Sequence, residues 1–150
     1  SDAAGPWPSQ RPEDWDVEAR MGAVGARLGN CNSTVSCHRQ HDSGDRVTDG
    51  DQEAYLLDEA WFLPRLYRCA LQAGVGSQAP AINRFARWVF MRARYLAGFG
   101  HRKQCFELLQ LAKTADPSLR FQVACFAAVA RVCGVRYAGR AAAWYDMRRA

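Results

Sequence analysis

The chain has 150 residues, of which 49% are hydrophobic, and this is enough for one sizeable core. Arg or another polar residue interrupts every apolar run before it approaches the roughly 20 residues of a membrane-spanning helix. The first residues lack the basic and then apolar order of a signal peptide. Length and composition therefore argue against a secreted, a membrane-spanning or a wholly disordered chain.

Charge is unevenly distributed along the chain. The formal net charge is +5, yet residues 1–51 are acidic overall and the remainder is strongly basic, with arginine in all but two of the basic positions. An arginine-rich half can meet nucleic acid, anionic lipid or phosphate groups, although charged runs more often form a solvated face. The arginines are spread over every predicted helix and accompany no nucleic-acid-binding motif, so we expect no nucleic-acid partner.

The first 51 residues form the less regular of two predicted domains, 1–51 and 52–150. They are rich in Gly, Pro, Asp, Ser and Asn. A helical turn or two is predicted over 14–21, a short irregular strand over 31–39, and an exposed loop over 42–51.

From residue 52 onward, hydrophobic periodicity predicts helices joined by short turns. Their predicted spans are about 52–73, 80–97, 101–115, 116–133 and 137–149. Asp116 followed by Pro117 predicts a helix start, and Pro64 should kink or divide the first helix. Short turns favour antiparallel neighbours, so the predicted fold class is mainly α: a helical hairpin bundle of about five helices, preceded by a loop-rich segment with a short strand.

The six cysteines are predicted to be reduced thiols in a cytosolic protein. Cys105, Cys125 and Cys133 recur among apolar residues at helical spacing, where a free cysteine behaves as a small hydrophobic residue. A chain with an ample core also has little need of disulfides.

A cluster of carboxylates near residue 14 is the first stretch that could carry chemistry. Glu13, Asp14, Asp16 and Glu18 could simply begin a helix, because acidic residues in a first turn complement the helix dipole. A catalytic interpretation needs one of them to act as a general base with a partner that tunes its pKa. Spacing alone leaves both interpretations open.

A polar loop at residues 38–44 is the second such stretch. Arg39 and His41 stand two residues apart, which suits an oxyanion or a metal-bound phosphate, and an ordinary surface loop is the alternative. Cys31, Cys37, His38 and His41 could together be zinc ligands, but the spacing between Cys31 and Cys37 is wrong for a structural zinc site.

Together, the two stretches resemble the inverting family-two glycosyltransferases of the GT-A type. The acidic motif of that family is matched by residues 13–21, Glu-Asp-Trp-Asp-Val-Glu-Ala-Arg-Met, and its histidine loop by residues 38–44, His-Arg-Gln-His-Asp-Ser-Gly. His38 stands where the family usually has Tyr. The resemblance implies that residues 1–51 are the acceptor-side edge of a GT-A-like catalytic domain, whose nucleotide-binding half would precede residue 1.

The acidic motif would supply the catalytic and acceptor-binding groups. By this resemblance, Asp14 would be the general base that deprotonates the acceptor hydroxyl, and Glu13 would support it. Trp15 and Asp16 would contribute to the acceptor-binding pocket.

The histidine loop would serve the leaving group. Arg39 would contact the nucleoside diphosphate, and His41 would be a ligand of a divalent metal, Mg or Mn, in the full-length parent. The missing nucleotide-binding half would be the main partner, so this chain alone should hold no cofactor and should be inactive.

The predicted helical domain, residues 52–150, suggests other partners and an alternative function. Trp61, Phe62, Trp88, Phe90 and Tyr95 lie near arginines, which would suit an anionic membrane surface, although aromatic residues at helical spacing are more often core. The predicted location is cytoplasmic or peripheral to the inner membrane, and the oligomeric state is left open. The alternative function is a non-enzymatic helical protein-interaction module with a flexible N-terminal arm.

Overall fold

The computed structural model describes residues 13–25 and 52–148, which are mainly helical. Its elements are α1 (Glu13–Ala23), α2 (Gln52–Gln72), α3 (Pro80–Phe99), α4 (Arg102–Ala115), the short 3-10 helix η3 (Pro117–Leu119), α5 (Arg120–Val132) and α6 (Val135–Met147). The prediction of a mainly helical bundle is confirmed. The strand predicted over 31–39 lies outside the described residues.

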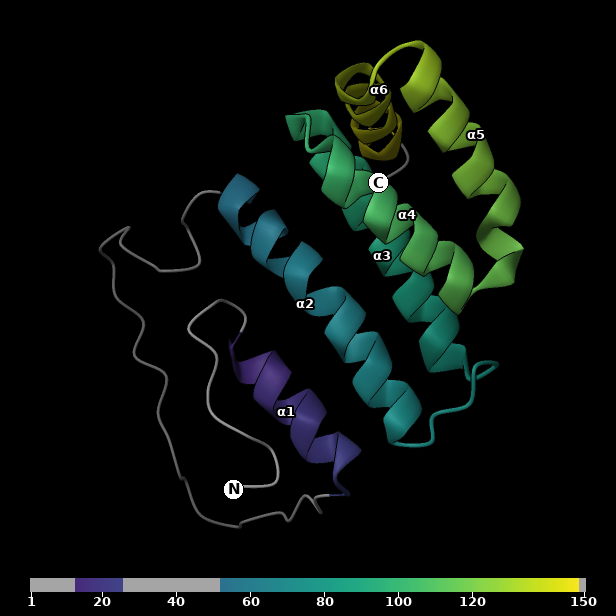
Figure 1. Cartoon of the computed structure of the whole chain (residues 1–150). Helices are drawn as coiled ribbons and strands as arrows, with labels where there is room; N and C mark the ends of the chain where they lie inside the picture. Colours follow the sequence, from purple (N-terminus) through teal and green to yellow (C-terminus); the bar gives the residue numbers. More distant parts are fainter. Residues whose placement is uncertain (1–12, 26–51, 149–150) are drawn as a thin grey trace.

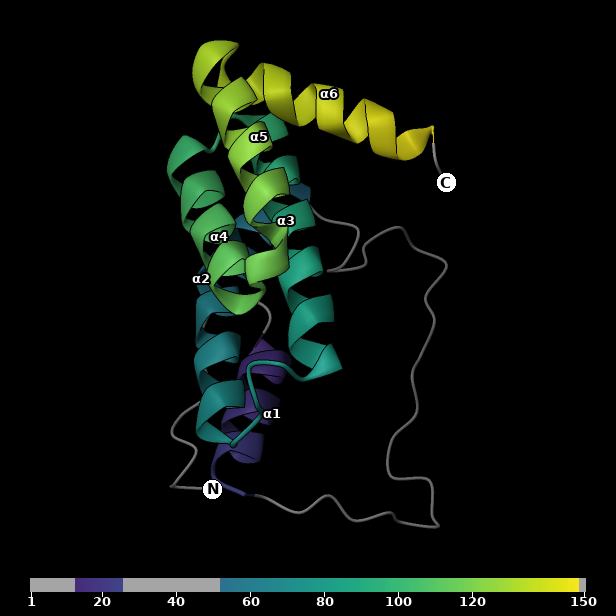
Figure 2. The ribbon, with the colours of Figure 1, turned by 90° about the vertical axis from the view of Figure 1, so that its right-hand side faces the viewer.

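The helices pack around a central pair, α3 and α4, as an antiparallel hairpin (Figure 1). Helix α2 lies along this pair, and α1 packs on the outer side of α2. Helix α5 lies on the other side of the pair, and α6 crosses the end of α3 instead of running along it (Figure 2). None of these helices is long and apolar enough to traverse a bilayer.

Helix α3 supplies the middle of the core because its apolar residues recur three and four positions apart. Ile82, Ala86, Val89, Ala93 and Leu96 are all buried. Residues from α2, α4 and α5 close over this stripe, so each helix buries one face against α3 or α4.

Helix α2 runs without a break through Pro64, so of the two predicted effects of this residue, a kink or a division of the helix, the structure excludes division. Proline removes one backbone donor and crowds the preceding turn, which is a local cost. The buried residues before it, Leu56, Phe62 and Leu63, hold α2 against the bundle. Tertiary packing outweighs the local preference here.

The predicted boundary at Asp116 is confirmed in detail. The Asp116 side chain accepts a hydrogen bond of 2.9 Å from the Ser118 backbone N–H, as an N-cap does. Hydrogen bonds from the side chain and the backbone of Ser118 lower the pKa of Asp116. The cap opens the 3-10 turn η3, and the α-helical geometry of α5 begins only at Arg120.

Helices α3 and α6 cross at two glycines. A Cβ atom built on Gly139 would lie 2.1 Å from the backbone nitrogen of Gly98 and 2.6 Å from the carbonyl carbon of Ala97. The two backbones therefore touch directly, which only glycine at position 139 allows. The contact fixes where α6 lies across α3.

Candidate functional site

Trp15 attaches helix α1 to the bundle through an aromatic cluster. Its ring centroid lies 6.2 Å from that of the buried Phe62 on α2 and 5.9 Å from that of Trp88 on α3. Trp88 in turn contacts Phe85 edge-on. Tilted contacts at these separations add to the stability that burial provides. Trp15 keeps 41% of its surface exposed, so it both anchors α1 and borders solvent.

Asp16 makes the second attachment of α1. Its side chain is buried, with 1% of the residue exposed. Arg20, one helical turn later, places Nε 3.0 Å from Oδ2, and Arg65 of α2 places Nε 3.2 Å from Oδ1. A buried carboxylate is costly unless it is paired. Here each carboxylate oxygen faces one guanidinium, so Asp16 ties the two helices together.

A hollow of about 270 Å³ lies beside this ion pair, between α1 and α2. Its lining residues are Asp16, Arg20, Arg65, Arg68, Cys69 and Gln72. Three guanidinium groups face one carboxylate, so the lining has an excess of positive charge. Such a lining suits an anionic group, because guanidinium donors bind carboxylate and phosphate oxygens strongly.

The structure describes the other predicted site residues only in part. Glu13 and Asp14 form the start of α1, and their side chains lie outside the described part of the structure. Arg39 and His41 lie outside the described residues altogether. The structure therefore brings Trp15 and Asp16 together on the α2 side of α1, and their acceptor-binding role stays a prediction.

No family model, curated protein or solved structure matches this chain.

Glu59 is a second buried carboxylate, and sequence reasoning missed it. It is fully buried between α2 and α3, and its Oε2 lies 2.8 Å from Nε of Arg92. Burial raises the pKa of Glu59, and the positive charge of Arg92 opposes that rise. The same environment raises the pKa of Tyr55, through burial and the nearby Glu59 carboxylate. The sequence signal that could have found Glu59 is an acidic residue at a position where the three-and-four spacing of the apolar residues in α2 predicts burial.

A larger cavity of about 700 Å³ lies where α6 crosses α3, close to the start of α2. Its lining residues are Gln52, Tyr95, Gly98, Phe99, Gly139, Arg140, Ala143 and Asp146. Asp146 is held in place by Arg94, whose Nη2 lies 2.5 Å from its carboxylate. The lining is mostly apolar with few polar groups at its edge, and it includes Tyr95, which the sequence analysis considered for a membrane surface.

Potential metal ligands do not cluster within residues 13–25 and 52–148, and the cysteines there form no disulfide. That part of the chain contains no cluster of three His, Cys, Asp or Glu side chains suited to a metal ion. Its cysteines, Cys69, Cys105, Cys125 and Cys133, are free thiols. Burial raises the pKa of Cys105 to about 12, which makes that thiol unreactive.

Proposed function

We propose that this chain is the C-terminal part of a sugar-nucleotide-dependent glycosyltransferase, with Asp14 as its general base. The observation that carries the proposal is the ion-paired attachment of α1 to the bundle through Asp16. In the matched motif, Asp16 and Arg20 pair with each other and with Arg65. Together with Trp15, they account structurally for the second half of the motif.

The first half of the motif, Glu13 and Asp14, remains for chemistry. Attachment through Trp15 and Asp16 fixes the axis and rotation of α1, so the helix start has a defined position on the bundle. A general base must be held within reach of the proton that it removes. A rigid helix start supplies that positioning better than a free loop does.

In the proposed reaction, Asp14 accepts the proton of an acceptor hydroxyl as its oxygen attacks the anomeric carbon. The bond from that carbon to the nucleoside diphosphate breaks, and the diphosphate leaves with the electron pair. Arg39 would offset the charge of the leaving group. His41, which lies outside the described residues, would hold a divalent metal beside the leaving group.

The test replaces Asp14 with Asn in the longer polypeptide that carries this chain. Release of nucleoside diphosphate from UDP-, GDP- and TDP-linked hexoses, with and without candidate acceptors, identifies the active donor for the measurement. The Asp14→Asn variant should lose about 100-fold or more in kcat, the usual contribution of general base catalysis, and should keep its thermal unfolding midpoint.

Glu18→Gln provides the matched control on the same helix. Glu18 is exposed and lies outside the proposed catalytic pair, so transfer should stay within about two-fold of wild type. Full turnover by the Asp14→Asn variant would remove Asp14 from the base role. Absence of transfer by the unaltered longer polypeptide would favour the helical interaction module instead.

A further inference from the structure

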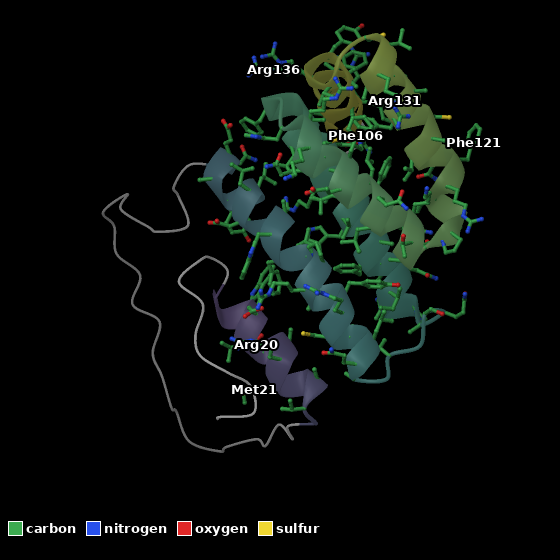
Figure 3. All side chains as sticks on the ribbon, in the orientation of Figure 1. Arg20, Met21, Phe106, Phe121, Arg131 and Arg136 are labelled. Atoms are coloured by element: carbon green, nitrogen blue, oxygen red, sulfur yellow. The ribbon has the colours of Figure 1, made fainter. Side chains whose placement is uncertain are left out.

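Helix α5 has an apolar outer face as well as an apolar inner face. Val123, Ala127 and Ala130 are buried against the bundle. On the opposite side, Phe121 is 79% exposed and Val132 is 85% exposed. Figure 3 shows Phe121 projecting away from the bundle at the outer edge of α5. A helix that is apolar on both sides normally has a neighbour on both sides.

Helix α6, which packs against α5, also carries exposed aromatic residues. The side turned to the viewer in Figure 2 shows both α5 and α6 without another helix over them. We name the exposed apolar residues of these two helices the α5–α6 face: Phe121, Val129, Val132, Tyr137, Trp144 and Tyr145. Exposed apolar side chains gathered on two helices that pack against each other mark a contact site for a partner or a membrane.

The charged residues of α5 and α6 are almost all positive. Four exposed arginines belong to its two helices and a fifth, Arg148, directly follows α6; the four are Arg120, Arg131, Arg136 and Arg140. Asp146 is the single acidic residue between 117 and 148, and Arg94 of α3 already pairs with it. Arg148 lies over the Trp144 ring, 3.9 Å from its centroid, so charge and aromatic surface are interleaved.

We propose that the α5–α6 face binds the surface of an anionic membrane. Its largest apolar side chains project outward, which suits insertion among lipid headgroups, and tryptophan and tyrosine favour that interfacial region. Arginines among them are complementary to anionic headgroups. A second copy of the same face would instead bring arginines toward arginines. The proposal rests on α5 and α6 alone and is independent of the proposed transfer reaction.

The test measures co-sedimentation of the 150-residue chain with vesicles. One set contains phosphatidylcholine alone, and the other contains equal parts of phosphatidylcholine and phosphatidylglycerol. We expect binding to the anionic vesicles, weak binding to the neutral ones, and a decrease in binding as salt is added. Equal binding to both sets, or binding to neither, would overturn the proposal.

Paired substitutions locate the contact. Phe121→Ser with Val132→Ser should weaken binding to anionic vesicles by at least about ten-fold, because both side chains lose apolar contact with lipid. Met21→Ser with Leu71→Ser removes apolar side chains that are 42% and 43% exposed from α1 and α2, away from this face, and should leave binding within about two-fold. All four positions are exposed, so circular dichroism should show unchanged helix content. Equal losses in the two pairs would overturn the assignment to this face.

Charge variants separate electrostatic attraction from apolar contact. Arg120→Gln and Arg140→Gln should each weaken binding by about five-fold, and the corresponding lysine variants should retain it. If sedimentation instead reveals self-association that Phe121→Ser with Val132→Ser abolishes, while vesicle binding is absent, the face is a contact between copies and the membrane proposal is wrong.

Discussion

Replacing Gly139 with alanine is expected to lower the free energy of unfolding by about 3 kcal/mol or more, because it overpacks a backbone contact. The added Cβ would lie 2.1 Å from the backbone nitrogen of Gly98. A backbone atom cannot turn aside as a flexible side chain can, so α6 must shift along or away from α3. Urea unfolding followed by circular dichroism measures the loss.

Gly98→Ala is the matched control for that prediction. It lies at the same crossing, but its Cβ would meet its nearest neighbours, in Gly139 and Arg140, at 3.7 and 3.9 Å, which is ordinary contact. Alanine is favoured over glycine within a helix by about 1 kcal/mol, so this variant should be as stable as wild type or slightly more stable. Equal stability of the Gly139→Ala and Gly98→Ala proteins would show that the helices do not cross so closely.

Replacing Arg92 with methionine is expected to cost about 3–5 kcal/mol of stability at neutral pH, because it leaves a buried carboxylate unpaired. Glu59 is fully buried, and its ion pair with Arg92 is 2.8 Å long. Adding Glu59→Gln to Arg92→Met should restore much of the loss, since no buried charge then remains. Failure of the second substitution to restore stability would mean that Arg92 acts through packing alone.

The same pair gives a pH dependence with a defined sign. Burial raises the pKa of Glu59 above its ordinary value of 4.5, so the folded protein holds this proton more tightly than the unfolded chain. The corresponding stability is present below pH 4.5 and is lost as the pH rises through the raised pKa. Unfolding of the Glu59→Gln protein should lack this loss, and the loss should be larger in Arg92→Met, which no longer has the opposing charge.

Sequence periodicity predicted the helices well because their apolar residues recur every three or four positions. The cap at Asp116 was predictable for a similar local reason, since its partner Ser118 is two residues away. Pro64 shows the limit of local reasoning: its effect on α2 depends on how strongly the residues around it are held by other helices.

The contacts of the candidate site were not predictable in the same way. Asp16 pairs with Arg65, 49 residues later in the chain, and no spacing rule connects them. Glu59 interrupts the apolar stripe of α2 in the sequence, and only the packing of α3 against α2 brings Arg92 opposite it. Both depend on how helices pack, which periodicity does not specify.

The aromatic residues illustrate the same point. Of those considered for a membrane surface, Phe62 is fully buried and Trp88 packs against the core, as the core interpretation predicted. The strongly exposed Phe121 and Val132 lie instead on α5. Their spacing alone could not show which side of that helix would meet the bundle.

A double-mutant cycle between Asp16 and Arg65 tests most directly whether the acidic motif is built onto the helical bundle. The cycle compares the unfolding free energies of wild type, Asp16→Asn, Arg65→Gln and the double variant. Because the two side chains contact each other at 3.2 Å, we predict a coupling energy of about 1 kcal/mol or more. A coupling energy near zero would show that α1 does not dock through Asp16, and the positioning proposed for Asp14 would lose its basis.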